Sequence, residues 1–333
     1  MLKIGINGIG RIGKAVFREI IDNRHDVTIV GINDLYNVED ILYYLKYDSI
    51  YGKLNHNISV ENNYLLVNNH KIRVTNKKNP QNINWKDVDA SVIIESTGMF
   101  LTKQLSELHI KSGAKKVIMS APSKDNTPMF VMGVNHDDYN LKYDIISNAS
   151  CTTNCIAPIA KVIHDNFIIK EGLMSTVHAS TNTQNLLDVL SKKSRLNRSS
   201  LLNIIPHSTG AAIALGKVIP ELSNKITGIS FRVPIGNVSL LDFNIKTEKS
   251  TSYDEIKYKI KDASKSYLHN ILSYVEDSIV SQDILKDPRI SIFDANAGMQ
   301  LNKNFFKIIA WYDNEYGYAN KLIDLGLYIY KKL

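Results

Sequence analysis

The sequence predicts an α/β protein of two domains: a doubly wound domain on a mostly parallel sheet, then an α+β domain with a largely antiparallel sheet. Two observations carry this prediction. Residues 1–34 run through a short apolar strand, a glycine-rich turn, a helical segment and a second strand, which is the order of a βαβ unit. After residue 150, several long extended segments follow with few helices between them, as in antiparallel sheets. We place the first domain at 1–149 and the second at 150–314.

The composition suits this plan. The chain has 333 residues, of which 44% are apolar and 22% charged, enough for two ordinary domains with sizeable cores. No apolar run approaches the ~20 residues of a membrane span, and no signal peptide is readable after Met1. Two cysteines four residues apart suit a reducing compartment. We therefore expect a cytoplasmic protein with no membrane partner and no metal.

The net charge of +7 raises the question of a nucleic-acid partner. Basic residues are scattered, however, apart from a loose cluster at Lys192, Lys193, Arg195 and Arg198. Lys, Ile and Asn all have AT-rich codons and are all heavily used, so compositional drift accounts for the charge. Because a binding footprint should form a face or a run, we do not expect nucleic acid to bind.

The first element reads as a strand at Leu2–Ile6, followed by a G-x-G-x-x-G turn and a helix over Lys14–Asp22. A second strand, Val27–Ile32, ends in Asn33-Asp34. Glycines at the first turn and an acid about 20 residues later are the Rossmann-type dinucleotide fingerprint. Asp34 can accept hydrogen bonds from a ribose hydroxyl and would repel a 2′-phosphate, which favours NAD over NADP. The alternative is a glycine-rich turn in some other α/β protein. The turn supplies Gly8, Gly10, Arg11, Ile12 and Gly13.

Further strands complete the first domain. Tyr64–Val67 and Lys71–Val74 flank Asn68-Asn69-His70, a predicted hairpin turn. Ala90–Glu95 and Lys116–Ser120 are buried-strand runs that end in small residues. The carboxyl ends of parallel strands are where such sheets bind ligands.

Cys151 is the strongest catalytic candidate. Small and hydroxyl residues precede it and a helical run, Asn154–Phe167, follows, so we expect it at a helix N-terminus. The helix dipole and first-turn N–H groups there favour an anion and should lower the thiol pKa. A thiolate is the nucleophile. The alternative is a small buried apolar residue, and that is how we interpret Cys155, one turn further on.

The second domain continues with strands and helices whose bounds we predict from pattern. The strands are expected at 172–178, 226–234, 239–246 and 305–312, and the helices at 211–218, 253–268 and 319–331. We expect the C-terminal helix, about 315–333, to pack back on the first domain.

At this point the sequence resembles a known family. The segments are NGIGRIG near the start, SNASCTTNCIAP at 147–158, TVHASTNTQ at 176–184, NIIPHSTGAA at 203–212, FRVP at 231–234 and WYDNEYGYANKL at 311–322. Together they resemble phosphorylating, NAD-dependent glyceraldehyde-3-phosphate dehydrogenases, and are most similar to the bacterial glycolytic type. The resemblance runs from the first strand to the last helix.

The resemblance implies oxidation of D-glyceraldehyde 3-phosphate to 1,3-bisphosphoglycerate, with reduction of NAD, through a Cys151 hemithioacetal and thioester. His178 would be the partner of Cys151, first in an ion pair and then as a proton acceptor. The substrate phosphate would lie on Thr181 and Arg232. The attacking phosphate would lie on Ser150, Thr152, Thr209 and Gly210. The resemblance assigns NAD to the glycine turn, with Arg11 and Ile12 at the pyrophosphate, and to Asp34, Lys78, Ser120 and Asn314.

Two departures from the family stand out, and two alternatives remain. The loop 188–198 lacks the family's usual Gly and Pro and is one residue shorter, and Lys78 stands where the family often has Arg. The family implies a homotetramer, whose geometry this loop affects. Erythrose-4-phosphate dehydrogenase is one alternative, against which Thr181 and Ser208-Thr209-Gly210 argue. A non-catalytic, basic RNA-binding scaffold is the other, against which the intact catalytic positions argue.

Overall fold

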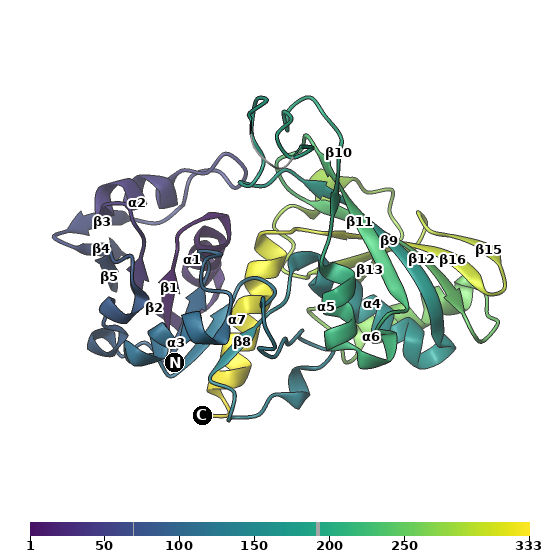
Figure 1. Ribbon diagram of the computed structural model, residues 1–333, viewed down its shortest axis with the longest axis horizontal. Coiled ribbons are helices and arrows are strands. Elements are labelled where there is room, and N and C mark those ends of the chain that lie inside the picture. Colours follow the sequence, from purple (N-terminus) through teal and green to yellow (C-terminus); the bar gives the residue numbers. More distant parts are fainter. Residues whose placement is uncertain (69, 191–193) are drawn as a thin grey trace. The chain divides into compact units, whose positions relative to one another are not determined.

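The computed structural model describes residues 1–68, 70–190 and 194–333, which form two compact units. The first unit comprises Met1–Phe130, His136–Ala149 and Ala319–Leu333, and the second comprises Val131–Asn135 and Ser150–Tyr318. Figure 1 traces the chain through both. Asn69 of the predicted hairpin turn and the basic pair Lys192 and Lys193 lie outside the described residues. Among the described residues, no helix has both the length and the apolar character to cross a membrane.

The first unit is built on one sheet with the order β3-β4-β5-β2-β1-β6-β7-β8. Its central strands pair in parallel, and only β3–β4 and β4–β5 are antiparallel. The predicted parallel sheet is therefore confirmed, as is the predicted hairpin, now β4–β5. The strands are β1 (Leu2–Asn7), β2 (Val27–Asn33), β3 (Ile58–Glu61), β4 (Tyr64–Val67), β5 (His70–Thr75), β6 (Val92–Glu95), β7 (Lys116–Met119) and β8 (Ile145–Ser147).

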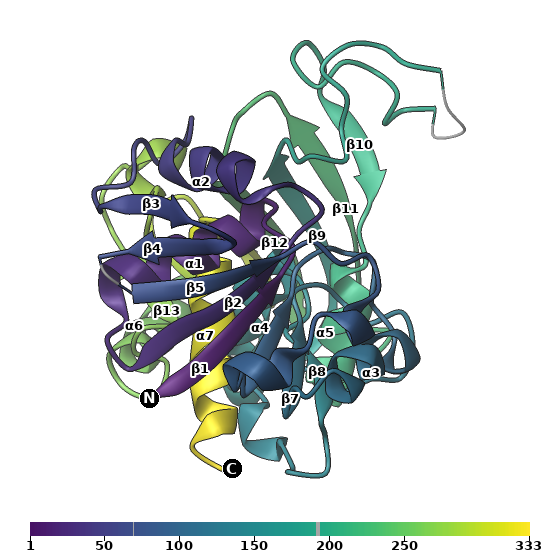
Figure 2. The ribbon, with the colours of Figure 1, turned by 90° about the vertical axis from the view of Figure 1, so that its left-hand side faces the viewer.

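Helices cover this sheet, and Figure 2 looks at it from the side of the first unit. Two short helices that the sequence patterns did not reveal begin at side-chain caps: Asn37 accepts from Asp40 N–H, and Thr102 accepts from Leu105 N–H. From Ala319 on, the last helix lies against the sheet, because a Cβ on Gly326 would touch side chains of β1, β6 and β7. The helices are α1 (Arg11–Asn23), α2 (Val38–Lys46), α3 (Lys103–Lys111) and α7 (Tyr316–Tyr330).

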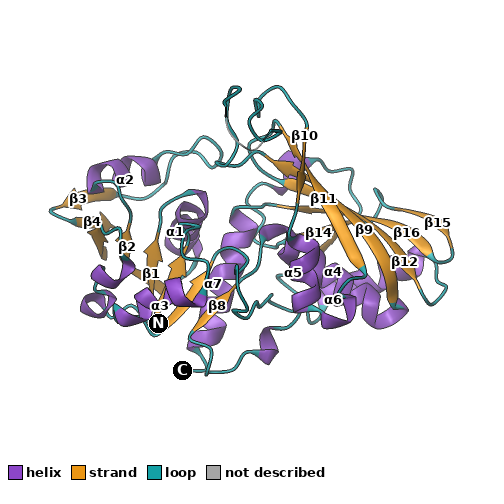
Figure 3. Cartoon of the chain, in the orientation of Figure 1, coloured by secondary structure: helices purple, strands orange, loops and turns teal. Residues whose placement is uncertain are grey.

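The second unit is built on a sheet with the order β10-β11-β9-β12-β16-β14-β13, with β15 paired to β16. Only β9–β11 and β13–β14 are parallel, so the expectation of a largely antiparallel sheet is confirmed. Figure 3 shows its long strands in orange. The strands are β9 (Ile169–Ala179), β10 (Ile205–Ser208), β11 (Ile226–Val233), β12 (Ser239–Thr247), β13 (Leu272–Val275), β14 (Ser291–Asp294), β15 (Met299–Asn302) and β16 (Phe305–Tyr312).

Helix α4 (Cys151–Phe167) is the buried helix of this unit, packed on β9, β12, β14 and β16. Thirteen of its 17 residues are buried, among them the polar Thr152, Thr153, Asn154 and His164. The other helices are α5 (Ala211–Val218) and α6 (Tyr253–Lys265). Helix α5 packs on α4 and on β11, the strand that carries Arg232.

Candidate active site

Cys151 and His178 meet within the second unit. Cys151 is the first residue of α4 and is partly exposed, and its Sγ lies 3.5 Å from His178 Nε2. His178 is next to last in β9 and is only 5% exposed. The two residues that the sequence analysis paired are therefore within reach of a proton transfer.

A side-chain cap fixes where α4 begins. The Ser150 hydroxyl accepts a hydrogen bond from Thr153 N–H at 3.1 Å, and the Asn154 amide donates to the Ser150 carbonyl at 3.0 Å. This cap starts the helix at Cys151, three residues before the start expected from apolar spacing alone. The Ser150 hydroxyl also lies 2.7 Å from that of Thr153.

The pKa values of the pair are set first by burial. Burial raises the pKa of the Cys151 thiol, while the positive charge of Arg232 and hydrogen bonds from Thr152 oppose that rise. Burial and, second to it, the positive charge of Arg232 together lower the pKa of His178 to about 3. We expected the helix N-terminus to lower the thiol pKa, but the cost of burying a thiolate is larger here. Both shifts favour the neutral thiol–imidazole pair over the ion pair that the resemblance implies, with His178 placed to take the proton.

Arg232 joins the pair from the neighbouring strand. It stands opposite His178 in the parallel β9–β11 register, and its Nη1 lies 2.7 Å from His178 Nδ1. The same Nδ1 lies 2.8 Å from the Ala179 carbonyl oxygen. A guanidinium only donates, so Nδ1 either accepts from Arg232 or donates to Ala179. The tautomer with its proton on Nδ1 leaves Nε2 free to accept the thiol proton, which is what a general base requires.

Tyr312 completes this cluster, and the sequence analysis gave it no role. The residue is fully buried at the end of β16, and its hydroxyl lies 2.9 Å from Thr152 Oγ1 and 2.8 Å from Thr176 Oγ1. Its ring meets that of His178 edge to face at 6.1 Å. Burial raises the pKa of Tyr312 well above its ordinary value, so the phenol stays neutral and fixes the start of α4 against β9.

The other predicted phosphate ligands make local bonds. The Thr181 hydroxyl pairs with that of Thr183 at 3.0 Å, and the Thr209 hydroxyl accepts from Ala211 N–H at 3.2 Å. Gly210 is exposed at the N-cap of α5, which has no side-chain cap. A Cβ on Gly210 would meet no atom within 4 Å, so the first N–H groups of α5 are open to an anion.

Cys155 differs from Cys151 in every respect that bears on reactivity. It is fully buried, its Sγ lies 3.9 Å from the Ser291 hydroxyl, and burial raises its thiol pKa well above the ordinary value. A thiol held neutral in this way is unreactive.

In the first unit, the glycine turn has the shape that a dinucleotide needs. Gly8 has φ +92°, a conformation that favours glycine. A Cβ on Gly13 would lie 2.0 Å from the Gly8 carbonyl oxygen, so helix packing requires that glycine. A Cβ on Gly10 would meet no atom within 4 Å. Helix α1 has no side-chain cap at Gly10 and no acid in its first turn, so Gly10 suits the close approach of a pyrophosphate.

Asp34 and Arg11 both border this turn. The Asp34 carboxylate, at the end of β2, accepts from Ile9 N–H and from Leu35 N–H, each at 2.6 Å. The Arg11 guanidinium binds the buried Asp48 carboxylate at 2.5 Å, and Lys14 binds it at 2.7 Å. Arg11 therefore contributes to the turn through its backbone at the start of α1, beside Ile12, while its charged group holds Asp48.

The remaining cofactor candidates divide between the units. Lys78 is exposed in the loop after β5, and Ser120 follows β7, where its N–H donates to the Glu95 carbonyl. Asn314 belongs to the second unit, where its side-chain Oδ1 accepts a hydrogen bond from the Ser239 hydroxyl at 2.8 Å. Sequence patterns missed Asp313, a buried carboxylate that accepts from Glu315 N–H and Tyr316 N–H and so starts α7.

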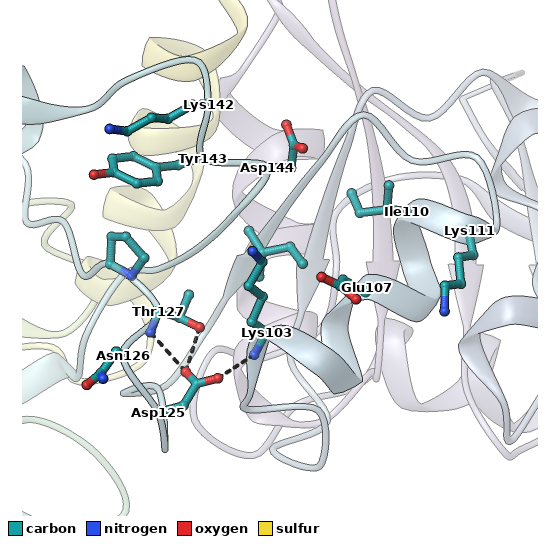
Figure 4. A pocket seen from close by; sticks show the side chains of 12 residues that line it. Lys103, Glu107, Ile110, Lys111, Asp125, Asn126, Thr127, Lys142, Tyr143 and Asp144 are labelled. Atoms are coloured by element: carbon teal, nitrogen blue, oxygen red, sulfur yellow. Dashed lines mark hydrogen bonds between the residues drawn. The ribbon is translucent and has the colours of Figure 1, made fainter.

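A hollow of about 790 Å³ lies elsewhere on the first unit, between α3 and the segment before β8 (Figure 4). Lys103, Lys111 and Lys142 line it together with three acids, Glu107, Asp125 and Asp144. Asp125 accepts hydrogen bonds from Lys103 N–H and from the Thr127 hydroxyl, and Asp144 forms an ion pair with Lys116. Charges of both signs balance around this hollow and no predicted site residue lines it, so we assign it no ligand.

The comparisons with known proteins agree on one family. Residues 2–103 match the family described as glyceraldehyde 3-phosphate dehydrogenase, NAD binding domain, and residues 150–314 match its C-terminal domain. The chain is 53% identical over 334 residues to glyceraldehyde-3-phosphate dehydrogenase of Bacteroides fragilis strain YCH46, covering 100% of both chains. It is 52% identical to glyceraldehyde-3-phosphate dehydrogenase A of Escherichia coli strain K12, covering 99% of both. It is 53% identical to glyceraldehyde-3-phosphate dehydrogenase of Cochliobolus heterostrophus, covering 99% of this chain and 98% of that one.

Proposed function

The chain belongs to the glyceraldehyde-3-phosphate dehydrogenase family, and from that premise we propose that it oxidises D-glyceraldehyde 3-phosphate to 1,3-bisphosphoglycerate, with NAD and inorganic phosphate as co-substrates. One observation carries the mechanism: Cys151 Sγ, at the start of α4, lies 3.5 Å from Nε2 of the buried His178. A nucleophile and a base within reach of each other are the parts that covalent aldehyde oxidation needs.

His178 Nε2 takes the thiol proton as Cys151 Sγ forms a bond to the aldehyde carbon. It then gives that proton to the former carbonyl oxygen, which becomes the hydroxyl of a hemithioacetal and leaves Nε2 free again. Bound NAD supplies the acceptor for the hydride that leaves this carbon. His178 then takes the hydroxyl proton, and the carbon becomes the acyl carbon of a Cys151 thioester. A phosphate oxygen attacks that carbon, the C–S bond breaks, and Cys151 leaves as the thiolate. The thioester keeps the free energy of oxidation that hydrolysis would release.

Two anion sites serve this reaction. Arg232 and Thr181 hold the phosphate of the aldehyde substrate, since a guanidinium gives charge-assisted hydrogen bonds. Ser150, Thr152, Thr209 and Gly210 hold the attacking phosphate. The open N-terminus of α5 at Gly210 supports this assignment. The Thr152 hydroxyl is engaged with Tyr312, so Thr152 contributes through its backbone N–H.

NAD is held by the first unit. Gly8, Gly10 and Gly13 form the turn, and the N–H groups of Arg11 and Ile12 at the start of α1 receive the pyrophosphate. Asp34 accepts from the adenosine ribose and disfavours a 2′-phosphate. We assign Lys78 to the adenine side, Ser120 to the nicotinamide side and Asn314 to the carboxamide. Residues 1–149, with the C-terminal helix, thus act as the NAD-binding domain and 150–314 as the catalytic domain.

We also propose that the protein is a cytoplasmic homotetramer. The segment 186–202 exposes several large apolar side chains within its described residues. Leu190 is fully exposed and Leu202 is 82% exposed. Apolar side chains gathered on one loop favour burial against another surface, and in a homotetramer that surface is another copy of the chain.

The test follows formation of the reduced cofactor, NADH or NADPH, at 340 nm. Three sets contain phosphate: glyceraldehyde 3-phosphate with NAD, the same aldehyde with NADP, and erythrose 4-phosphate with NAD. The fourth set is glyceraldehyde 3-phosphate with NAD but no phosphate. We expect rapid turnover only in the first set. Preference for erythrose 4-phosphate would replace the proposal by that sister activity. Absence of turnover with every set would favour a non-catalytic scaffold.

A further inference from the structure

A buried carboxylate lies beneath the proposed NAD-binding turn, and the mechanism does not use it. Glu95 ends β6 and is 0% exposed, as is His109 of α3. Glu95 stands opposite Asn7, the last residue of β1, in the parallel register. The residue that follows β1 in the chain is Gly8, where the glycine turn begins.

The hydrogen bond from Trp85 fixes the tautomer of His109, which contacts Glu95. Trp85 Nε1 can only donate, and it lies 2.9 Å from His109 Nδ1, which therefore accepts. The His109 proton is then on Nε2, which lies 3.0 Å from Glu95 Oε2 and donates to it. Asn7 Nδ2 donates to the same oxygen at 2.5 Å. Glu95 Oε2 thus accepts from both His109 and Asn7; within the described residues, no lysine or arginine pairs with Glu95.

The other oxygen of Glu95 holds the segment after β6. Thr97 donates to Oε1 both from its N–H, at 2.8 Å, and from its hydroxyl. Thr97 in turn abuts the glycine turn, since a Cβ on Gly8 would lie 2.9 Å from Thr97 N. The neighbouring Ser96 hydroxyl donates to the Gly8 carbonyl at 2.7 Å. Through these hydrogen bonds, Glu95 holds residues 96 and 97 against Gly8.

The chain of bonds continues along the carboxyl edge of the sheet. Asn33, at the end of β2, donates to Asn7 Oδ1 at 2.8 Å and accepts from Lys77 N–H at 2.9 Å. The Thr75 hydroxyl, at the end of β5, also donates to Asn33 at 2.9 Å. From Trp85 to Lys77, one continuous series of hydrogen bonds ties together the ends of β6, β1, β2 and β5.

We propose that His109, acting through Glu95, is a positioning residue for NAD: its Nε2–H holds the carboxylate that keeps Thr97 against Gly8 and so preserves the shape of the pyrophosphate turn. The inference rests on the proposed NAD function of that turn. Removing the donor leaves a buried carboxylate short of a hydrogen bond, which is costly. Glu95 then shifts to find another hydrogen-bond partner, Thr97 moves with it, and the glycine turn loses its fixed conformation.

The test compares His109→Leu, which removes the donor, with His109→Gln, whose amide N–H can still reach Glu95. Ser106→Ala is the matched control, because Ser106 is a fully buried residue on the same helix whose hydroxyl donates to the Phe100 carbonyl, away from the network. The readouts are the Kd of NAD by titration, kcat at saturating NAD, and Tm. We expect the Kd to rise about ten-fold in His109→Leu, with kcat changed less than about two-fold. His109→Gln should stay within about three-fold of the unmutated protein, and Ser106→Ala should lower Tm alone.

Equal Kd values for His109→Leu and the unmutated protein would overturn the proposal, as would an equal rise in the Ser106→Ala control. If His109→Leu does not fold, the exposed Thr97 decides: Thr97→Val removes the hydroxyl bound to Glu95 and should weaken NAD several-fold, while Thr97→Ser should not. Identical NAD affinities for those two variants would equally overturn it. Failure of the unmutated protein to bind NAD contradicts the proposed function instead, and the two failures are thus told apart.

Discussion

The two cysteines stand one helical turn apart on α4 and have opposite surroundings. Cys151 is partly exposed beside His178 and Arg232, whereas Cys155 is fully buried beside Ser291. We predict that Cys151→Ser lowers kcat by on the order of 10³-fold or more, while Cys155→Ser keeps near-normal activity. Mass spectrometry after stoichiometric iodoacetate should find the label on Cys151. Equal loss of activity in both variants would contradict the assignment.

The buried His178 gives the fold a pH dependence whose sign can be worked out. Its pKa is lowered from 6.5 to about 3, first by burial and then by the charge of Arg232. Between these values the unfolded chain binds this proton and the folded chain does not, so stability is kept above about pH 6.5 and is lost as the pH falls towards 3. In urea unfolding, the free energy of unfolding should fall less steeply with decreasing pH for His178→Gln than for the unmutated protein. Carboxylates contribute equally in both proteins, so identical slopes would contradict the role of His178.

At this scale the sequence predicted much of the cluster. Cys151, His178 and Arg232 were named from their motifs, and the β9–β11 register brings the last two together. Tyr312 was not assigned a role, because nothing local distinguishes it among 17 tyrosines. Its importance comes from bonds to Thr152 and Thr176, residues 160 and 136 positions away, and only the folded chain shows them. The phosphate and cofactor roles of the other site residues stay predictions.

The strand–turn–helix element offers a test of why each glycine is present. Gly13 is required by packing, since a Cβ there would lie 2.0 Å from the Gly8 carbonyl oxygen, whereas a Cβ on Gly10 would meet nothing. We predict that Gly13→Ala lowers stability by about 1–3 kcal/mol. Gly10→Ala should leave Tm nearly unchanged and weaken NAD at least several-fold. Thermal unfolding and NAD titration separate the two effects. Normal NAD affinity in Gly10→Ala would contradict the assignment of the pyrophosphate to this position.

Among the elements, segments with a clear apolar run or apolar spacing were predicted, and several others were missed. Helix α5 was placed at 211–218 and β16 at 305–312, as the structure has them. Helices α2 and α3, of nine residues each, were missed. The buried residues of α3 are the polar Ser106 and His109, so apolar spacing does not mark this helix. Strands β3, β8, β10 and β13–β15 are only three or four residues long, and their place in a sheet comes from partners far along the chain.

For the whole molecule, the two fold types were predicted from the βαβ start and from the change of pattern after Cys151. The pairing order of the second sheet, with β9 between β11 and β12, could not be predicted, because it depends on contacts between distant segments. The boundaries at 149 and 314 stay predictions. The altered loop 188–198 includes 191–193, which lie outside the described residues.

Assembly is also a property of the whole molecule. We predict a tetramer of the 37.5 kDa chain, stabilised by the apolar side chains of segment 186–202. Leu202→Glu should shift sedimentation towards smaller species, because a carboxylate in an apolar interface is costly to bury. Leu141→Glu is the control, an exposed leucine outside this segment. A monomer for the unmutated protein at micromolar concentration would contradict the prediction.

The proposed mechanism depends on a Cys151 thioester that is cleaved rapidly only by phosphate. Its most direct test is rapid mixing of enzyme, NAD and glyceraldehyde 3-phosphate without phosphate or arsenate, with NADH followed by absorbance. We predict a burst that approaches one NADH per active chain, then very slow turnover, and resumption of full rate when phosphate is added. Thr209→Ala should give the same burst but need several-fold more phosphate for the second phase, because one neutral hydrogen bond of about 1 kcal/mol is lost. Full-rate steady NADH production without phosphate would contradict the phosphorylating mechanism.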